Sequence, residues 1–410
     1  MTDKKSLVPK RRFKEFKNTH AWKQRKFGEL ADIVRGASPR PIQDPKWFDD
    51  ESDIGWLRIA DVTEQDGRIH FLKQRISKAG QEKTRVLTET HLLLSIAATV
   101  GKPVVNHVKT GVHDGFLIFQ NPKFNREFMF QWLEMFRPKW QKYGQPGSQV
   151  NLNSDLVKNQ EIMLPSEEEQ KKIGEFFYQL DNLISLQQRK LEKMKALKSA
   201  YLSEMFPAEG ELEPKRRFAG FTQAWKQRKL KTVFKDFIVP MRDKPKEFSG
   251  TVPWTRIEDI EGRFINGTTS GQFVSEETIK SMNLKVIPKG SLIVSASATF
   301  GVVAIVNNDL ITNQTFIGLV PNTNYNIDFL YAFFKSTSIQ RKMKRESAGS
   351  TIFYISREQF ENMIGEFPIL EEQEKIGKLF KQLDDTIALH QRKLEKLQNI
   401  KKAYLMEMFV

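Results

Sequence analysis

The chain repeats its framework once, half-way along its 410 residues, and this repeat constrains the fold more than any other feature of the sequence. Residues 21–26 read AWKQRK, and residues 224–229 read it again. Residues 188–193 and 391–396 both read QRKLEK, at the same separation of 203 positions. Between these copies the two halves are largely different. We therefore expect one scaffold that is built twice and presents two different surfaces.

Each half contains the same parts in the same order. A basic-aromatic arm, PKRRF, precedes AWKQRK, a variable region and a segment with helical periodicity, and a linker rich in Pro and Gly separates the halves. The sequence therefore divides into an N-terminal basic arm (1–20), a first variable domain (21–162), a central long helix (163–206), a linker with the repeated arm (207–223), a second variable domain (224–366) and a C-terminal long helix (367–410).

The two long segments carry apolar side chains at alternating steps of four and three residues, the pattern of a helix that pairs with another helix. Ser166 and Glu169 are spaced as a capping box at the first helix start. Because such a stripe cannot stay exposed, we expect the helices to pair antiparallel, as a coiled coil with a pseudo-two-fold axis between the halves. The stripe residues are Ile173, Phe177, Leu180, Ile184, Leu191, Met194 and Tyr201, and Ile376, Phe380, Leu383, Ile387, Leu394, Leu397 and Tyr404.

Both variable regions mix β-rich runs with helical patches. Helical patterns lie at 126–136 and 327–343, and Gly, Pro and Asn separate the apolar runs. The predicted fold class is α+β: two α/β domains, each followed by a long helix. The predicted β runs are 99–105, 115–119, 291–295, 301–306 and 315–320.

The composition favours a polyanionic partner. The net charge of +15 points to nucleic acid ahead of a membrane surface. The absence of cysteine excludes disulfides, thiolate zinc sites and cysteine nucleophiles, and the six histidines lack metal-ligand spacing. No apolar run approaches the roughly 20 residues of a membrane helix, and the N-terminus lacks a signal-peptide core. We therefore expect a cytoplasmic protein without a metal site.

Motifs for catalysis are missing. The segment 119–124, FQNPKF, comes near the N-P-P-[FY] motif of amino-methyltransferases, but Lys123 replaces the second proline and no Gly-rich cofactor loop precedes it. We interpret it as a turn. The sequence also contains no G-x-x-x-x-G-K-[ST] loop for ATP. We therefore predict no catalytic residues and no cofactor bound by this chain.

The layout resembles the specificity subunits of type I restriction–modification enzymes over the whole chain. The resemblance rests on a P-x-x-x-E-Q-x-x-I opening of each long helix, with Gln170 and Gln373, and on W-[IL]-R-x-x-D-[VI] at 56–62 with an echo at 254–260. It also rests on T-x-G at 299–301 with N-Q-x-F at 313–316. The first half departs at 113–116, HDGF, and its G-x-[ST]-P element at 36–39 has no clear mate in the second half.

The resemblance implies a DNA-binding subunit that does no chemistry itself. Each variable domain would be a target-recognition domain for one half of a bipartite, asymmetric double-stranded DNA sequence. The paired helices would set the gap and bind two methyltransferase subunits, and restriction/translocase subunits would complete the complex. S-adenosylmethionine, ATP and magnesium would then belong to those partners, with no membrane involved.

Reading bases in a groove requires Arg, Lys, Asn, Gln, Ser and Thr side chains on loops. Polar, Gly-containing loops of the variable domains supply the candidates. They are Ser38, Arg40, Lys102, Tyr143, Gln145, Ser148 and Gln149 in the first domain, and Arg242, Lys244, Arg345, Ser347, Ser350 and Thr351 in the second. We interpret Trp56 and Trp254 as core residues rather than base-stacking platforms.

Alternatives remain open at this point. The basic residues along the two helices, such as Lys198 and Lys401, are either a solvated face or a contact surface for phosphates or partner subunits. A self-contained restriction enzyme or methyltransferase, and a coiled-coil scaffold with heads for carbohydrate or protein, are the rival functions. Activity of the isolated chain distinguishes the first rival, and salt-sensitive DNA binding argues against the second.

Overall fold

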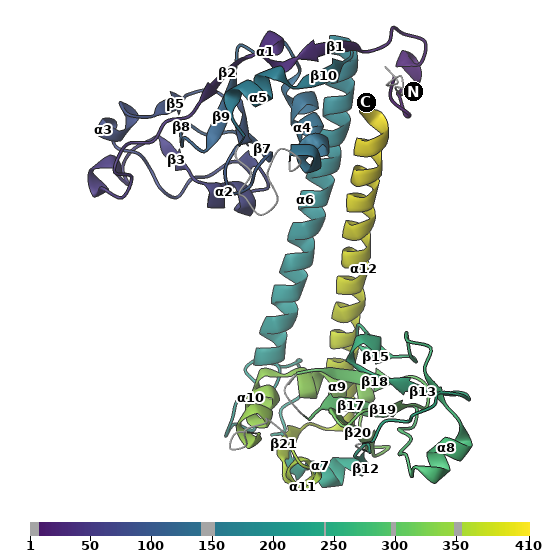
Figure 1. Ribbon diagram of the computed structural model, residues 1–410. Coiled ribbons are helices and arrows are strands. Elements are labelled where there is room, and N and C mark those ends of the chain that lie inside the picture. The colour runs from purple at the N-terminus through teal and green to yellow at the C-terminus, as the bar shows by residue number, and fades with distance from the viewer. Residues whose placement is uncertain (1–7, 141–151, 242, 297–300, 348–354) are drawn as a thin grey trace. The chain divides into compact units, whose positions relative to one another are not determined.

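The computed structural model describes residues 8–140, 152–241, 243–296, 301–347 and 355–410 (Figure 1). Its contacts divide the chain into two compact units, Met1–Leu186 with Leu394–Val410, and Gln187–Lys393. Each unit therefore contains one variable domain, the beginning of one long helix and the end of the other. The long helices are α6 (Glu167–Glu204) and α12 (Leu370–Met408).

The variable domain of the first unit contains mixed β-sheets and short helices. Its five-stranded sheet has the order β2 (Asp32–Arg35), β9 (Phe116–Gln120), β6 (Leu92–Ser95), β7 (Pro103–Asn106) and β4 (Arg68–Ile69). The smaller sheets are β3 (Gly55–Leu57), β8 (Thr110–Val112) and β5 (Arg85–Leu87), and β1 (Lys23–Lys26) with β10 (Glu161–Leu164). The helices are α1 (Phe27–Leu30), α2 (Ile59–Glu64), α3 (Lys78–Gln81), α4 (Arg126–Trp140) and α5 (Ser154–Asn159), with 3-10 turns at Lys14–Phe16 and Pro45–Trp47.

The second unit repeats this plan. Its six-stranded sheet has the order β12 (Phe234–Ile238), β20 (Phe316–Pro321), β17 (Leu292–Ser295), β18 (Val303–Val306), β15 (Phe264–Ile265) and β14 (Ile260–Glu261). The smaller sheets are β16 (Phe273–Val274), β13 (Val252–Thr255) and β19 (Ile311–Thr312), and β11 (Lys226–Lys229) with β21 (Ile364–Phe367). The helices are α7 (Leu230–Val233), α8 (Glu276–Ser281), α9 (Ile327–Lys335), α10 (Thr337–Glu346) and α11 (Arg357–Asn362), with a 3-10 turn at Ile257–Asp259.

The core of each domain explains why these segments become strands and helices. β6, β7, β17 and β18 are buried along their whole length, which fits their continuous apolar runs. In the first unit α4 contributes Phe128, Trp132 and Trp140 to the main core. In the second unit α9 contributes Phe329 and Phe333 to the equivalent core. The α+β prediction is confirmed, and each predicted β run overlaps an observed strand.

The helix predicted at 327–343 differs in detail. It is interrupted at Ser336, whose backbone is extended, with φ −65° and ψ 148°, so that α9 and α10 are separate. The Ser336 hydroxyl donates to the carbonyl of Phe333 at 2.6 Å, which satisfies a group at the end of α9. Periodicity alone does not reveal such a break, because apolar side chains continue on both sides of it.

The AWKQRK repeat has a structural explanation in both units. Trp22 and Trp225 are 2% exposed and belong to the two main cores. The following KQRK residues form β1 and β11, which pair antiparallel with β10 and β21, the strands that lead into the long helices. The identical hexapeptide therefore supplies the strand that pairs with the last strand of each variable domain, directly before the long helix begins.

The long helices run antiparallel within each unit, as the heptad stripes predict (Figure 1). In the first unit Phe176 contacts Tyr404 and Phe177 contacts Phe409. In the second unit Phe206 packs on Phe380, at a ring-centroid distance of 5.9 Å. The beginning of each helix thus packs against the end of the other, and both pairs belong to the core of their unit.

Candidate nucleic-acid interface

The loop after β2 is bonded to the turn that follows β8. The amides of Gly36 and Ala37 donate to the carbonyls of Phe116 and Val112, at 2.9 and 3.0 Å. A Cβ atom at Gly36 would lie 2.2 Å from the carbonyl oxygen of His113, so only glycine fits there. The G-x-[ST]-P element therefore brings its loop against the HDGF segment, a contact that sequence reasoning did not predict.

Two predicted contact residues, Ser38 and Arg40, meet at Asp114. The Ser38 hydroxyl donates to Asp114 Oδ1 at 2.8 Å and accepts the Asp114 amide at 3.1 Å, which holds the loop in place. Arg40 Nη2 lies 3.2 Å from Asp114 Oδ2, and its side chain is 82% exposed. Burial raises the pKa of Asp114, but the Ser38 hydrogen bond and the nearby positive charges lower it overall. Ser38 thus supports the loop, while Arg40 projects from it.

Four arginines lie at one edge of the three-stranded sheet formed by β3, β8 and β5. We call this group, Arg35, Arg40, Arg58 and Arg85, the arginine edge. The parallel strands β3 and β8 end together, and β5 begins at Arg85 opposite Val112, so their flanking residues emerge at the same edge. Arg85 Nε donates to the Arg35 carbonyl, and Arg35 Nε donates to the Asp114 carbonyl, both at 2.7 Å. All four side chains reach solvent, and such a positive edge attracts phosphates.

The W-x-R-x-x-D motif is a structural device in both domains. Asp61 is 2% exposed and accepts the Arg58 amide at 2.9 Å and its guanidinium at 3.1 Å. Asp259 accepts the Arg256 amide at 2.7 Å. In both domains the aspartate thus caps the first turn of the short helix, and in the first domain it also orients the arginine side chain. In the second domain the Arg256 guanidinium donates to Gln272 Oε1 at 2.7 Å instead. Trp56 and Trp254 are 2% and 3% exposed, as expected for core residues.

Lys102 forms two ion pairs within the first domain. Its Nζ lies 2.6 Å from Asp66 Oδ1 and 2.7 Å from Glu134 Oε1, and its side chain is 12% exposed. Burial opposes ionisation, but Glu134 and Asp66 outweigh it and raise the pKa of Lys102. Glu134 is 15% exposed and Asp66 is 89% exposed, so Lys102 would have to leave a largely buried carboxylate and an exposed one to reach a base. The other candidates of this domain, Tyr143, Gln145, Ser148 and Gln149, lie outside the described residues.

The candidates of the second domain fall into three groups. Lys244 is exposed and lies over the Phe248 ring at 5.3 Å, and Arg345 is exposed and paired with Glu209 at 2.6 Å. Ser347 is 2% exposed, and its hydroxyl donates to the Lys344 carbonyl at 2.7 Å, so it caps the end of a helix. Arg242, Ser350 and Thr351 lie outside the described residues.

The repeated PKRRF arm is a strap across the helix pair of each unit. In the first unit Arg12 donates to both carboxylate oxygens of Glu169 at 2.6 Å, and Arg11 pairs with Glu407 at 2.5 Å over the Tyr404 ring. Adjacent arginines thus bind the start of α6 and the end of α12. The capping-box prediction for Ser166 and Glu169 is only half right, because the Glu169 amide lies 3.4 Å from Ser166 Oγ while its carboxylate binds Arg12.

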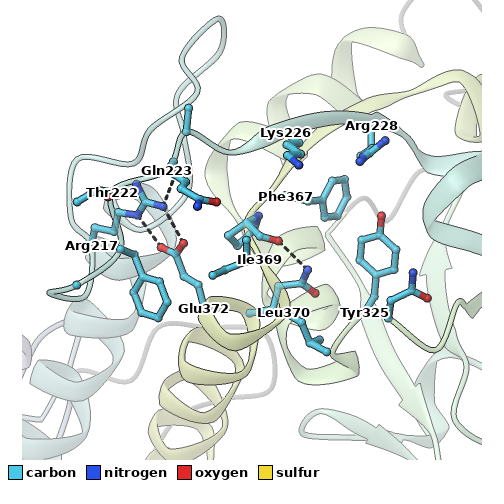
Figure 2. A pocket seen from close by; sticks show the side chains of 16 residues that line it. Arg217, Thr222, Gln223, Lys226, Arg228, Tyr325, Phe367, Ile369, Leu370 and Glu372 are labelled. Carbon is cyan, nitrogen blue, oxygen red and sulfur yellow. Dashed lines mark hydrogen bonds and ion pairs between the residues drawn. The ribbon is translucent and has the colours of Figure 1, made fainter.

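Figure 2 shows the strap of the second unit beside a pocket. Arg217 donates to the two carboxylate oxygens of Glu372 at 2.7 and 2.8 Å and to the Gln223 carbonyl at 2.6 Å. Arg216 pairs with Glu204 at 2.7 Å. The pocket lies between this strap, β11 and the first turn of α12, and Lys226 and Arg228 line it. The identical arms indicate a shared role in the sequence, but the sequence alone does not identify Glu169 and Glu372 as the residues that they bind.

The E-Q pair of each helix opening attaches the variable domain to its helix. Gln170 accepts the Asn125 amide at 2.9 Å and donates to the Pro165 carbonyl at 3.0 Å. Gln373 accepts the Asn326 amide at 3.1 Å in the same way. A Cβ at Gly174 would lie 2.8 Å from Asn125 Oδ1, so a glycine is needed for this close approach. The motif thus positions the variable domain on its helix.

A buried ion network links sheet and helices in each unit. Arg68 pairs with Glu127 at 2.8 Å and with Asp181 at 3.2 Å, and Lys401 reaches the same Asp181 at 2.6 Å. In the second unit Arg263 pairs with Asp328, and Lys198 pairs with Asp384. Arg263 also lies 3.8 Å from Asp384, and its side chain is only 3% exposed. The sequence did not predict these pairings.

The predicted helix stripe lies inside the helix pairs. Each of its residues is buried or partly buried. Polar stripe positions have partners on the facing helix: Gln187 hydrogen-bonds His390 at 2.5 Å, and Lys198 and Lys401 face aspartates. Lys198 and Lys401 therefore form ion pairs with aspartates of the same chain. The other predicted basic residues of the helices are exposed or half-buried, and they are Arg189, Lys190, Lys193, Lys195, Arg392, Lys393, Lys396 and Lys402.

Membrane and metal sites are absent from the described part of the chain. No helix in the described ranges is long and apolar enough to span a bilayer. Within the same ranges, no group of three or more His, Asp or Glu side chains could hold a metal ion. The 119–124 segment forms a bend with Asn121 at φ 49°, which agrees with its interpretation as a turn.

Comparison with known proteins identifies the repeat. A family model described as the type I restriction modification DNA specificity domain matches the chain twice, over residues 20–196 and 223–399. The specificity subunit of the type I restriction enzyme MjaIX from Methanocaldococcus jannaschii is 30% identical over 159 residues, or 38% of this chain and 37% of that protein. The putative MjaX specificity subunit of that organism is 25% identical over 263 residues, or 62% and 60%. The matched part of the chain therefore spans about a third to three-fifths of the length of these relatives.

Among solved structures, the S subunit of a type I restriction–modification system from M. genitalium has a similar fold. It aligns with a TM-score of 0.64 over 98% of this chain and 99% of that chain, at 16% identity. A structure that addresses complex assembly and conformational transition of a type I R-M system aligns with a TM-score of 0.52 over 94% and 96%, at 17% identity. At such identities the likeness concerns the fold alone.

Proposed function

Because the chain belongs to the family of type I restriction–modification DNA specificity domains, we propose that it is the subunit that selects the DNA sequence for such a complex. Each variable domain reads one half of a bipartite, asymmetric target. The chain performs no catalysis itself, and methyl transfer and cleavage belong to partner subunits. S-adenosylmethionine, ATP and magnesium are bound there.

One observation carries this proposal: the two units share their scaffold contacts and differ in the loops that face solvent. The strap and the helix opening recur in both units with the same residue types, and the ion network recurs with Glu127 in the first unit and Asp328 in the second. The arginine edge and the loop at 36–40 occur in the first domain, while the second domain has Lys244 and Asp243 after its corresponding strand. Two different surfaces on one duplicated frame suit two different half-sites.

The helices suit the second part of the proposal, which is assembly. Two methyltransferase subunits bind, one to each repeat, because the repeated segments offer two equivalent surfaces. Exposed apolar side chains support this assignment, since Leu186 and Leu389 occupy matching repeat positions and are 50% and 47% exposed. Restriction/translocase subunits then join that complex, and the paired helices set the gap between the half-sites.

The test is a selection of random double-stranded DNA by the full chain assembled with its methyltransferase subunits. We expect a split motif with a fixed gap, and an affinity that falls steeply with salt because phosphate contacts release counterions. Replacing residues 28–160 by the corresponding domain of another family member should change one half of the motif only. A complex that forms but selects no sequence would refute the specificity role and favour a scaffold with other ligands.

A further inference from the structure

A mainly apolar hollow opens beside the arginine edge of the first unit. Its lining includes Ile42, Phe48, Trp56 and Ile59, together with the polar side chains of Gln74 and His113. The apolar residues come from the 42–48 loop, β3 and the first turn of α2. Trp56 is fixed from two sides, by the Phe48 ring at 6.4 Å and the His113 ring at 5.8 Å. The floor of the hollow is therefore rigid.

His113 presents one hydrogen-bond donor at this hollow. Its Nδ1 accepts the Gly115 amide at 2.9 Å and lies 3.2 Å from Asp114 Oδ1, and the amide hydrogen bond favours the tautomer with the ring proton on Nε2. Burial lowers the pKa of His113, and Arg35 and Arg40 add to this effect while Asp114 opposes it, which favours the neutral ring. Within the described part of the chain, the structure gives no acceptor for the Nε2 hydrogen, and the side chain is 34% exposed.

The second domain uses a different residue for the same task. Asn313 follows β19 as His113 follows β8, and its Oδ1 accepts the Thr315 amide at 3.1 Å. The strand pairs correspond, since Trp56 lies opposite Gly111 and Trp254 lies opposite Ile311. Each side chain thus caps its own turn with one acceptor atom. What remains to bind a ligand is an imidazole N–H in one domain and a carboxamide NH₂ in the other.

We propose that the hollow beside His113 receives a base edge of the first half-site, and that positions 113 and 313 determine which bases the two domains prefer. This inference rests on the proposed function and names the residues that carry it. A neutral imidazole N–H donates to the major-groove acceptors of guanine, adenine or thymine, and an apolar floor suits the thymine methyl group. The arginine edge next to the hollow would hold the flanking phosphates and so set the register.

The experiment repeats the DNA selection with His113→Ala, His113→Asn and His107→Ala in the full chain with its methyltransferase subunits. His107 is an exposed histidine of the same domain that stacks on His70, 4.4 Å between centroids, and it is the matched control. Asparagine keeps an acceptor for Gly115 and reproduces the residue of the second domain. Melting curves of each variant establish that the domain is folded.

With His113→Ala we expect preference to fall about tenfold at one or two base pairs of one half-site, the discrimination of a single good base contact. With His113→Asn we expect a different base at that position. The other half-site and the gap stay unchanged in the same molecules, and His107→Ala resembles the wild type. A split motif that His113→Ala leaves intact overturns this inference alone. A wild-type complex without any motif overturns the proposed function as well.

Discussion

The contacts between recognition domain and long helix are the same in the two units, whereas the loops at the strand ends differ. Arg12 with Glu169 and Arg217 with Glu372 are one interaction made twice, with the carboxylate buried in both. At the strand ends, Ser38, Arg40 and Asp114 form a bonded cluster in the first unit, and Asp243 and Lys244 follow the matching strand in the second. The shared contacts therefore position the variable domains on the helices, and the divergent loops are where the proposed function places recognition.

The ion networks show that even the shared contacts differ in how deeply their side chains are buried. Arg263 is 3% exposed, while its counterpart Arg68 is 14% exposed and stacks on the Phe130 and Tyr178 rings. Some guanidinium nitrogens of both residues are buried without a hydrogen-bond partner in the described structure. A buried cation of this kind contributes mainly by compensating buried carboxylates. Its removal is therefore the most direct way to test whether the two units are energetically equivalent.

The largest effect is expected from Arg263→Met. The change leaves Asp328 without its cation and costs about 3–5 kcal/mol, the usual result of breaking a buried pair from one side. Arg68→Met should cost less, because Arg68 is more exposed than Arg263 and because Glu127 keeps a second cation, Arg126, at 3.7 Å. Urea unfolding of both variants measures the difference. Equal losses would mean that burial of the arginine does not set the energy of this network.

The straps provide the second test. Arg12→Ala and Arg217→Ala each leave a buried glutamate uncompensated, and we expect each to lower the free energy of unfolding by about 2 kcal/mol. Arg11→Ala and Arg216→Ala are matched controls, since their pairs are half exposed and screened by solvent. If the controls are as costly as the buried pair, the strap acts through packing of the arm rather than through charge.

The sequence predicts the duplicated frame well because repetition and periodicity are local signals. The heptad stripes identify α6 and α12, and the identical arms mark segments with a shared role. The ion networks escape such reasoning, because Arg68 finds its partners 59 and 113 positions away. Lys102 shows a second limit. Its polar loop predicts a DNA contact, but composition does not reveal that Asp66 and Glu134 pair with its charge.

The third test addresses the divergent loops. Arg40→Ala should leave stability unchanged, because the side chain is largely exposed, and should weaken DNA binding by the full complex several-fold. If Arg40 contacts a phosphate, the loss is uniform across sequences and the slope of log K against log salt falls by about 1. Glu82→Ala, an exposed residue of the same domain, is the control. A loss confined to particular sequences would instead make Arg40 a base-reading residue.

The smallest effect is expected from a permuted chain, which tests whether the linker and the chain ends are equivalent in the duplicated scaffold. In the first unit the Arg11 amide donates to the Glu407 carbonyl at 2.8 Å, and in the second the Arg216 amide donates to the Glu204 carbonyl at 2.8 Å. Arg11 thus meets the end of α12 as Arg216, after the linker, meets the end of α6. Gly210 has a positive φ of 86°, and a Cβ atom there would meet nothing within 4 Å, so opening the chain at this point disturbs little.

A chain that begins at Glu211, with its original ends joined by a short flexible linker, should fold with a melting temperature within a few degrees of the original. In this permuted chain Arg216 and its partner Glu204 lie on opposite sides of the chain break, so no linker joins them. The ion pair of Arg217 with Glu372 is kept. Circular dichroism and thermal melting measure the outcome. An insoluble or non-helical product would show that the covalent linker, and not the duplicated contacts, holds the second repeat to the first.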